Sequence, residues 1–324
     1  MDRLVFYNRS AIDALTQVRD GETKLGQQFR TIDSLEALGQ CPAHFVILGI
    51  PEDIGVRANH GMAGTAGFWE ATVKALANVQ SNVFLGGREM LLLGYFDIAP
   101  FEDSDFAALS QRVSEIDDMV YPVIEQIVRA GKVPIIVGGG HNNAYPILKG
   151  LSRAKEKPMD AVNIDAHADL RATDGRHSGN AFSYAIQDGY LSGYGIFGLH
   201  ENYNNATVLS QIEKSDRISC LYFDELIKTK DRTSIWSDFI KPFDYQMGLE
   251  IDMDAIANSL SSASTPTGFT LNDVRKMLLC AKKKVAYLHI AEGAVELSDG
   301  RKDPSGAKAA AYLVTDFVKA QLNW

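Results

Sequence analysis

Residues 161–171 have the sequence Ala-Val-Asn-Ile-Asp-Ala-His-Ala-Asp-Leu-Arg, in which a short apolar run leads directly into alternating polar and apolar residues. The apolar run predicts the end of a buried β-strand. On an extended chain, residues two apart point to the same side, so Asp165, His167 and Asp169 would project together. This triplet has two interpretations: a site for a divalent metal, or a polar strand end that faces solvent and whose histidine caps a loop.

Strand and helix patterns alternate along the rest of the chain. Apolar, β-branched runs predict strands, and apolar residues three or four apart predict helices. Expected strands are residues 43–50, 133–137, 161–164, 194–199, 218–223, 245–254 and 285–292, and expected helices are residues 68–78, 110–130, 182–187, 206–212, 235–240, 270–283 and 304–324. This order predicts an α/β fold: a single three-layer αβα domain over residues 1–324 with a mostly parallel central sheet, preceded by an irregular or short-helical lead-in at residues 1–42.

The composition of the 324-residue chain excludes several classes of partner. The formal net charge is −9 and the pI is about 5.3, and no basic stripe is present to meet nucleic-acid phosphates or an anionic membrane. No apolar run reaches the ~18 residues of a membrane span, and the N-terminus lacks the apolar region of a signal peptide. Three widely spaced cysteines, Cys41, Cys220 and Cys280, are typical of reduced thiols. We therefore expect a cytoplasmic protein that binds neither nucleic acid nor membranes.

A glycine-rich turn follows the expected strand at residues 133–137 and ends in His141. Glycine-rich turns between a strand and a helix can bind phosphate, but the G-x-G-x-x-G spacing of a dinucleotide site is missing. The glycines fit better with a sharp turn that delivers His141 into a cleft. On this segment alone, His141 is either a loop histidine or a metal ligand.

A second pair of acidic residues, Asp252 and Asp254, ends another apolar run. These carboxylates would again share one side of an extended chain, or one of them would cap a following helix. Glu250 would lie on the same side, further down the strand, as a structural partner of the site. His289 lies inside the last expected strand and is interpreted as a core or supporting histidine.

Six residues that follow three expected strands form the candidate metal site. The carboxyl ends of neighbouring parallel strands lie side by side, so these residues are expected to meet. Two imidazoles and four carboxylates suit Mn²⁺, with Ni²⁺ or Zn²⁺ as alternatives. Six ligands suit two ions that share carboxylates and activate a water for hydrolysis. The expected ligands are His141, Asp165, His167, Asp169, Asp252 and Asp254.

The three polar segments resemble the motifs of the ureohydrolases, the family of arginases, agmatinases and formimidoylglutamases. The motifs are Gly138-Gly-Gly-His141, Asp165-Ala-His-Ala-Asp169 and Glu250-Ile-Asp-Met-Asp254, in the order of the family, and the resemblance covers most of residues 43–300. It implies two Mn²⁺ per chain, a small-molecule substrate and a homo-oligomer, either a trimer or a hexamer.

The resemblance also implies roles for individual residues. One ion would be held by His141 and Asp169, the other by His167 and Asp254, and both would share Asp165 and Asp252. A hydroxide between the ions would attack a guanidinium or formimino carbon. The catalytic residues would be Asp169, which holds the hydroxide, and Glu292, which binds the cationic nitrogen group of the substrate.

Departures from the family pattern indicate the substrate. The family usually has Asp before the histidine of the first motif, where this chain has Gly140, so a hydrogen-bonding partner of His141 is missing or replaced. The family motif H-G-x-x-F is Ser-Gly-Asn-Ala-Phe at residues 178–182, with His177 one residue early. This form, and Arg171 directly after D-A-H-A-D-L, resembles formimidoylglutamases.

Formimidoylglutamate carries two carboxylates, and an arginine can bind one of them through two parallel hydrogen bonds. We therefore expect Arg171 to anchor the substrate, with Arg57 or Arg176 in support; the alternative is a surface salt bridge. The alternative for His177 is a loop-stabilising role. The expected substrate-binding residues are Arg171, His177, Ser178, Asn180 and Glu292.

These observations predict a binuclear-metal hydrolase that converts N-formimidoyl-L-glutamate to L-glutamate and formamide, a step of histidine degradation. Within the same chemical class, the alternative substrates are arginine, agmatine, guanidine and guanidino acids. From a different class, the alternative is a non-catalytic metal-binding relative, which Gly140 and the displaced His177 motivate.

Overall fold

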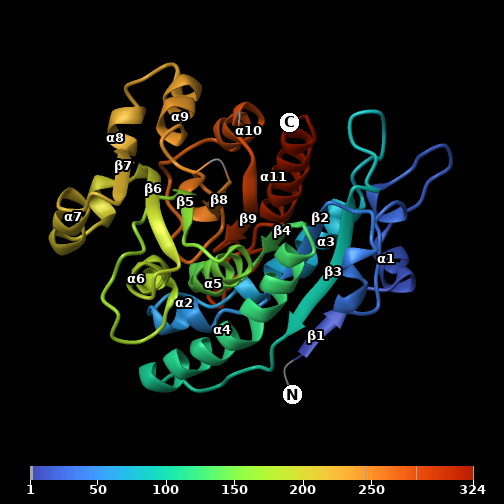
Figure 1. Cartoon of the computed structure of the whole chain (residues 1–324), viewed down its shortest axis with the longest axis horizontal. Helices are drawn as coiled ribbons and strands as arrows, with labels where there is room; N and C mark the ends of the chain where they lie inside the picture. The colour runs from blue at the N-terminus through green and yellow to red at the C-terminus, as the bar shows by residue number, and fades with distance from the viewer. Residues whose placement is uncertain (1–2, 245, 282, 324) are drawn as a thin grey trace.

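A nine-stranded central sheet runs through the computed structural model, which describes residues 3–244, 246–281 and 283–323 (Figure 1). The strand order is β1-β3-β2-β4-β9-β8-β5-β6-β7; β1 pairs antiparallel with β3, and the other neighbouring strands pair in parallel. The strands are β1 (Arg3–Phe6), β2 (Phe45–Gly49), β3 (Met90–Asp97), β4 (Val133–Val137), β5 (Met159–Ile164), β6 (Leu191–Leu199), β7 (Ile218–Tyr222), β8 (Met247–Asp252) and β9 (Val285–Ala291).

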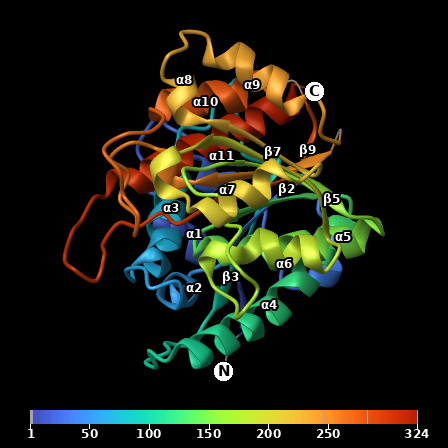
Figure 2. The same ribbon diagram turned by 90° about the vertical axis from the view of Figure 1, so that its left-hand side faces the viewer.

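Helices cover both faces of the sheet, which Figure 2 shows between two layers of helices. One apolar core includes side chains of α1, α3 and α8 to α11, and the other includes side chains of α2 and α4 to α7. The helices are α1 (Arg9–Leu15), α2 (Ile54–Ala58), α3 (Phe68–Ala77), α4 (Phe106–Arg129), α5 (Ala144–Lys155), α6 (Ala181–Gln187), α7 (Ala206–Glu213), α8 (Phe223–Leu226), α9 (Arg232–Ile240), α10 (Leu271–Cys280) and α11 (Ser305–Leu322). The predicted α/β fold with three layers and a mostly parallel sheet is confirmed.

The strongly periodic segments form the elements that the sequence predicts, within a few residues at each end. Thr270 caps α10, because its Oγ1 accepts a hydrogen bond from Asp273 N at 3.1 Å. Residues 245, 282 and 324, which belong to predicted elements, lie outside the described residues. None of the described helices combines the length and the apolar character that a membrane crossing requires.

The prediction that the first 42 residues are irregular or short-helical is wrong for Arg3–Phe6, which form the edge strand β1. Only four residues long, β1 is too short for a clear periodic signal, and its place is set by pairing with β3. The sequence patterns also missed β3 itself and α5. The run Met-Leu-Leu-Leu at the start of β3 is buried on both faces, and its leucines favour a helix as much as a strand.

The prediction that Asp165, His167 and Asp169 share one side of an extended chain is wrong in its geometry. Strand β5 ends at Ile164, and Asp165 turns the chain by accepting a hydrogen bond from His167 N at 2.7 Å through Oδ1. Asp169 then adopts a left-handed conformation, with φ of 51°. The three side chains therefore converge because the chain turns after the strand.

The same correction applies at the end of β8. Asp252 caps the 3₁₀ turn η7 (Met253–Ala255), because its Oδ1 accepts a hydrogen bond from Asp254 N at 2.8 Å. The capping alternative for this pair therefore describes the local structure. It does not remove Asp252 from the site, because its second oxygen, Oδ2, is 3.1 Å from His141 Nδ1.

Candidate metal centre

Four neighbouring strands of the sheet, in the order β4-β9-β8-β5, bring the candidate residues together at their carboxyl ends. His141 lies in the 3₁₀ turn η4 (His141–Asn143) after β4, and Glu292 directly follows β9. Asp252 ends β8, and Asp165 follows β5. Loops at the carboxyl ends of parallel strands are the usual place for a site in an open α/β sheet.

The turn before His141 depends on its glycines. Gly138 and Gly139 have φ of 90° and 78°, a region that residues with side chains rarely adopt. A side chain at Gly140, where the ureohydrolase pattern has an aspartate, would require Asn142 to move, since a Cβ there would lie 2.5 Å from Asn142 Oδ1. Glu52 holds the turn instead, because its Oε1 accepts a hydrogen bond from Gly140 N at 2.9 Å.

A first cluster of ligand atoms surrounds His141 Nδ1. Oδ2 of Asp169 and Oδ2 of Asp252 each lie 3.1 Å from this nitrogen, and Oδ2 of Asp165 lies 3.3 Å away. A ring nitrogen carries at most one hydrogen, so it cannot donate to three carboxylates at once. These four atoms instead have the composition and mutual spacing of ligands around one cation.

A second cluster consists of Asp165, His167 and Asp254. His167 Nδ1 lies 3.1 Å from Asp254 Oδ2 and 3.7 Å from Asp165 Oδ1. Asp165 thus offers one oxygen to each cluster, as expected of a shared ligand. Asp252 is the other ligand that we expected the two ions to share. Among the described residues, it lies close to the ligand atoms of the His141 cluster and is not part of the second cluster.

The donor set fits two divalent cations. It consists of two imidazoles and four carboxylates without a thiolate, which suits Mn²⁺ better than a soft metal. Burial, and then the charges of Asp254 and Asp165, raise the pKa of Asp252 well above its ordinary value. Asp254 Oδ1 is buried without a hydrogen-bond partner in the described structure. Cations between these carboxylates would remove their mutual repulsion and supply the missing partner.

A pocket of about 220 Å³ opens onto the two clusters and is lined by Asp169, Asp254 and Glu292. Glu292 has a φ of 61°, and its Oε1 accepts a hydrogen bond from His141 N at 2.9 Å. Burial chiefly raises the pKa of Glu292 to about 8, helped by the charges of Asp254 and Asp169. A cationic ligand in this pocket would favour the ionised form of Glu292.

Arg171 and Ser178 line the same pocket. Arg171 brings a positive charge to a pocket whose other charged residues are mainly acidic. Within the described part of the chain, the Arg171 guanidinium makes no hydrogen bond or ion pair. Ser178 Oγ accepts a hydrogen bond from Asn59 Nδ2 at 3.2 Å, and Asn59 also lines the pocket. The pocket therefore combines acidic residues of the two clusters with the unpaired guanidinium of Arg171 and small polar groups.

The other two arginines that were expected to support Arg171 are committed elsewhere. Arg57 donates to the backbone oxygen of Phe101 at 2.6 Å. Arg176 is buried and forms a hydrogen-bonded ion pair with Asp117, with 2.8 Å between Nε and Oδ2. The expectation that either supports Arg171 is wrong, because tertiary contacts already satisfy both guanidinium groups.

Two of the expected substrate-binding residues do not reach the metal pocket. Asn180 is fully buried, and its Nδ2 donates to the backbone oxygens of Ala172 and Gly175 at 2.9 and 2.7 Å. His177 Nδ1 accepts a hydrogen bond from Gly179 N at 3.1 Å. Both side chains therefore hold the loop, which is the alternative role considered for His177.

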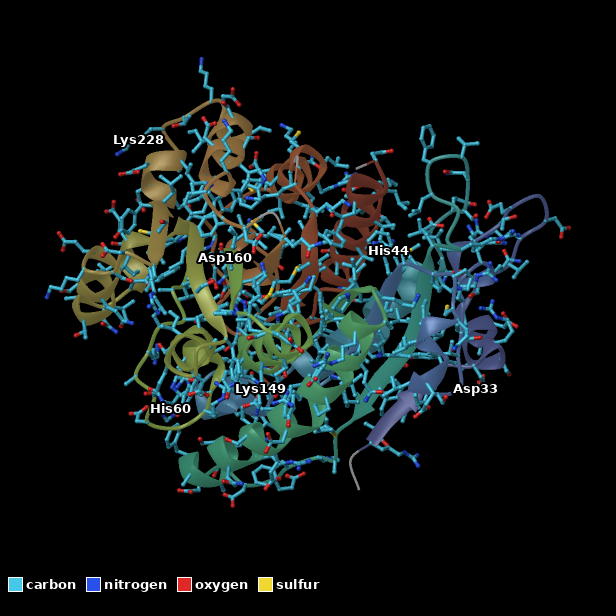
Figure 3. The ribbon with its side chains drawn as sticks, viewed as in Figure 1. Asp33, His44, His60, Lys149, Asp160 and Lys228 are labelled. Atoms are coloured by element: carbon cyan, nitrogen blue, oxygen red, sulfur yellow. The ribbon has the colours of Figure 1, made fainter. Side chains whose placement is uncertain are left out.

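His177 lines a neighbouring cavity of about 750 Å³. His60, which is labelled in Figure 3, lines the same cavity. Burial lowers the pKa of His177 to about 4, with smaller contributions from the charges of Arg171 and Arg176. A histidine with this pKa is neutral near pH 7 and is a poor proton donor there.

Sequence patterns missed two residues that brace the loop of residues 165–169. The ring of Tyr203 stacks on His167 with 5.4 Å between centroids, and its hydroxyl donates to Thr265 Oγ1 at 3.0 Å. Asn204 Oδ1 accepts a hydrogen bond from Ala168 N at 3.1 Å. Both residues follow strand β6, and residues that follow parallel strands often contribute to a site. Nothing in the sequence alone, however, indicates that the segment after β6 folds back over His167.

Known proteins resemble this chain over most of its length. The model of the arginase family matches residues 43–318. The formimidoylglutamase of Chromobacterium violaceum is 30% identical over 275 residues, which cover 82% of this chain and 84% of that protein. The crystal structure of Trypanosoma cruzi formiminoglutamase with Mn²⁺ has a TM-score of 0.71 and 19% identity, covering 92% of this chain and 98% of that one. Formimidoylglutamase from Bacillus subtilis has a TM-score of 0.76 and 17% identity, covering 95% and 94%.

Proposed function

Since this chain belongs to the arginase family, we propose that it is a two-manganese hydrolase that converts N-formimidoyl-L-glutamate and water to L-glutamate and formamide. The observation that carries the proposal is one pocket that joins two carboxylate–histidine clusters to the uncommitted guanidinium of Arg171. Formimidoylglutamate has the matching pattern, with a cationic formimino group at one end and two carboxylates at the other. The formimidoylglutamase of Chromobacterium violaceum, 30% identical to this chain, supports this choice of substrate.

The proposed ligands are those that the sequence predicts. We assign His141 and Asp169 to one ion, His167 and Asp254 to the other, and Asp165 to both. Asp252, which groups with His141 alone in the described structure, is assigned to both ions because the resemblance to the ureohydrolases implies it. When bound, the ions would polarise the formimino group and lower the pKa of a water, so that hydroxide forms near neutral pH.

The chain's own groups position the reactants. Asp169 lines the pocket beside His141, where its carboxylate accepts a hydrogen bond from the attacking water and fixes its direction. Glu292 lines the same pocket and accepts hydrogen bonds from the formimino nitrogens. Its negative charge stabilises the positive charge on the substrate and on the departing amine. The C–N bond to glutamate then breaks, and the glutamate nitrogen leaves with a proton from the attacking water.

We also propose that the whole chain is one domain and that it acts in the cytoplasm as a homo-oligomer, either a trimer or a hexamer, as the resemblance to the ureohydrolases implies.

A substrate panel tests the proposed reaction. Purified protein is assayed with formimidoylglutamate, arginine, agmatine, guanidine and a guanidino acid, with Mn²⁺ and separately with Ni²⁺. We expect kcat/KM for formimidoylglutamate to exceed the others by at least about 100-fold, because a buried polar site rejects ligands that leave its groups unpaired. Faster turnover of arginine or agmatine would contradict the substrate assignment. Loss of turnover on every compound by metal-loaded protein would favour a non-catalytic relative.

Arg171→Ala is expected to raise the KM for formimidoylglutamate by about 10- to 100-fold and to change kcat less, since a charged hydrogen bond contributes about 1.5–3 kcal/mol. Arg171→Lys should fall between the two, because lysine keeps the charge but not the paired hydrogen bonds. Arg88→Ala is the control, since Arg88 lies outside the pocket and its Nε donates to Gln28 Oε1. An unchanged KM in Arg171→Ala would remove Arg171 from the proposed substrate site.

A further inference from the structure

A row of buried polar residues crosses three strands directly beneath the metal centre. Asn163 on β5 pairs in register with Glu250 on β8, and Glu250 pairs with His289 on β9. All three side chains are completely buried in the middle of a sheet whose other inward positions are mostly apolar. Buried polar groups destabilise a fold unless they are hydrogen-bonded, so their contacts indicate what they do.

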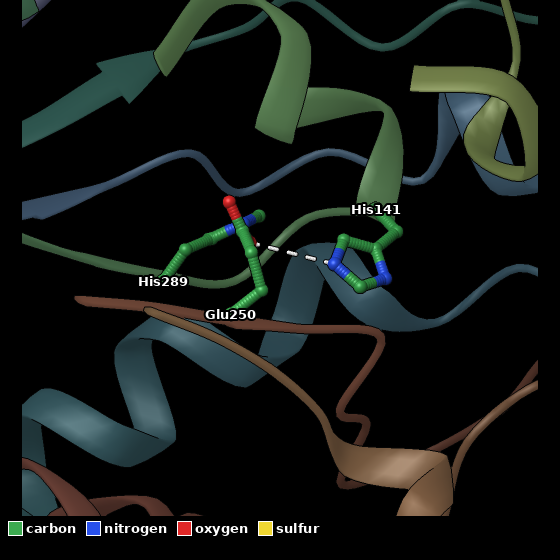
Figure 4. A group of neighbouring side chains, drawn as sticks. All are labelled: His141, Glu250 and His289. Atoms are coloured by element: carbon green, nitrogen blue, oxygen red, sulfur yellow. Dashed lines mark hydrogen bonds and ion pairs between the residues drawn. The ribbon is translucent and has the colours of Figure 1, made fainter. Parts of the chain in front are cut away.

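Glu250 receives its hydrogen bonds from two neighbours on β9. Its Oε1 accepts from the Tyr287 hydroxyl at 2.5 Å, and its Oε2 lies 2.6 Å from His289 Nδ1. The same Oε2 lies 3.4 Å from His141 Nε2, a buried nitrogen that makes no hydrogen bond within the described residues, and Figure 4 shows the carboxylate of Glu250 reaching towards this ring.

The two nitrogens of His141 face different environments. Nδ1 faces the carboxylates of the first cluster, and Nε2 faces Glu250 on the other side of the ring. A neutral imidazole that binds a metal through one nitrogen carries its hydrogen on the other. Histidine ligands usually donate that hydrogen to a carboxylate, a backbone oxygen or water, and such a partner strengthens the metal bond.

We propose that Glu250, held by Tyr287 and His289, is a positioning residue that orients His141 and strengthens the bond between His141 Nδ1 and the metal. This proposal rests on the two-metal site proposed above. It accounts for Gly140, where the ureohydrolase pattern has an acidic residue and this chain has no side chain. The carboxylate comes from β8, across the sheet, while the loop beside His141 stays tightly packed.

The cluster of His141, Glu250 and His289 does not serve as a separate metal site. The 2.6 Å between His289 Nδ1 and Glu250 Oε2 is a direct hydrogen-bond distance, which leaves no space for an ion between them. None of these three residues lines the pocket that opens onto the metal centre. Glu250 therefore acts on the metal through His141.

Glu250→Gln tests the proposal, because glutamine keeps the size of the side chain and removes its charge. Isothermal titration of metal-free protein with Mn²⁺ should resolve two binding events in the wild type. We expect the affinity of one ion to fall by about 10- to 100-fold in the variant, with the other changed less than about twofold. The melting temperature of the metal-free variant shows whether the fold is intact.

Glu52→Gln is the matched control. Glu52 is a buried carboxylate that holds the same turn through Gly140 N, but none of its hydrogen bonds involves the imidazole of His141. Equal losses of Mn²⁺ affinity in both variants would show that the turn, and not the charge beside His141, sets metal binding, and would overturn the proposal. A loss confined to Glu250→Gln supports it.

Tyr287→Phe provides a second test that removes only the hydroxyl donor to Glu250. The affinity for the same ion should fall by about two- to fivefold, which is less than the loss expected in Glu250→Gln. If Glu250→Gln does not fold, unchanged Mn²⁺ affinity in Tyr287→Phe overturns the proposal. Failure of the wild type to bind Mn²⁺ would instead contradict the two-metal site, so the two failures are distinguishable.

Discussion

Asp169→Asn is expected to lower kcat by about 10³-fold while the protein remains folded, because removal of a group that acts on the reacting water has effects of this order. Asp169 has a φ of 51°, and asparagine is one of the few residues that adopts this left-handed conformation readily. The variant therefore keeps the backbone and loses the charge. Initial rates with formimidoylglutamate and Mn²⁺, together with the melting temperature, check both expectations.

Asp118→Asn is the control for the same chemical change. The Asp118 side chain is 74% exposed and forms an ion pair with Lys149, away from the metal pocket. Its activity should match that of the wild type. If Asp169→Asn retained more than about a tenth of the wild-type kcat, the assignment of Asp169 as a metal and water ligand would be wrong.

Removal of the metal is expected to abolish turnover and to lower the melting temperature by about 8 °C relative to protein in excess Mn²⁺. Each ion at a concentration 100 times its Kd stabilises the fold by about 2.7 kcal/mol, and for a chain of this size two ions give a shift of that order. Chelation followed by gel filtration gives the metal-free protein, and calorimetry measures the shift. Added Mn²⁺ should restore activity.

The rise in melting temperature that Mn²⁺ causes should become smaller as the pH falls. Burial and neighbouring carboxylates raise the pKa values of Asp169 and Asp252, so metal-free protein holds protons at the site that the ions must displace. Lower pH therefore weakens metal binding. A Mn²⁺-induced shift that is absent at pH 7, or that grows on acidification, would contradict a carboxylate-rich site.

The sequence predicted the fold because most elements have strong local patterns. Helix α4 repeats its apolar residues every three or four positions over Phe106–Arg129, and β4 is a compact apolar run. These patterns depend on burial of one face or both faces, which the fold preserves. β1 and β3 were missed because their conformation depends on pairing partners distant in sequence.

The sequence predicted which residues form the candidate site better than it predicted how their side chains are arranged. Parallel strands end at the same edge, so the residues that follow them meet, whatever turns the chain makes. The turns themselves come from hydrogen bonds such as that from His167 N to Asp165 Oδ1, which no periodicity shows. The different environments of Arg57, Arg171 and Arg176 likewise depend on tertiary contacts.

The most direct test of a two-metal centre is the number of Mn²⁺ ions that each chain holds. Equilibrium dialysis against Mn²⁺, followed by elemental analysis of protein prepared without a chelator, measures this number. The proposed ligands predict two ions per wild-type chain. Fewer than about one ion per chain would contradict the metal centre and the hydrolytic function that rests on it.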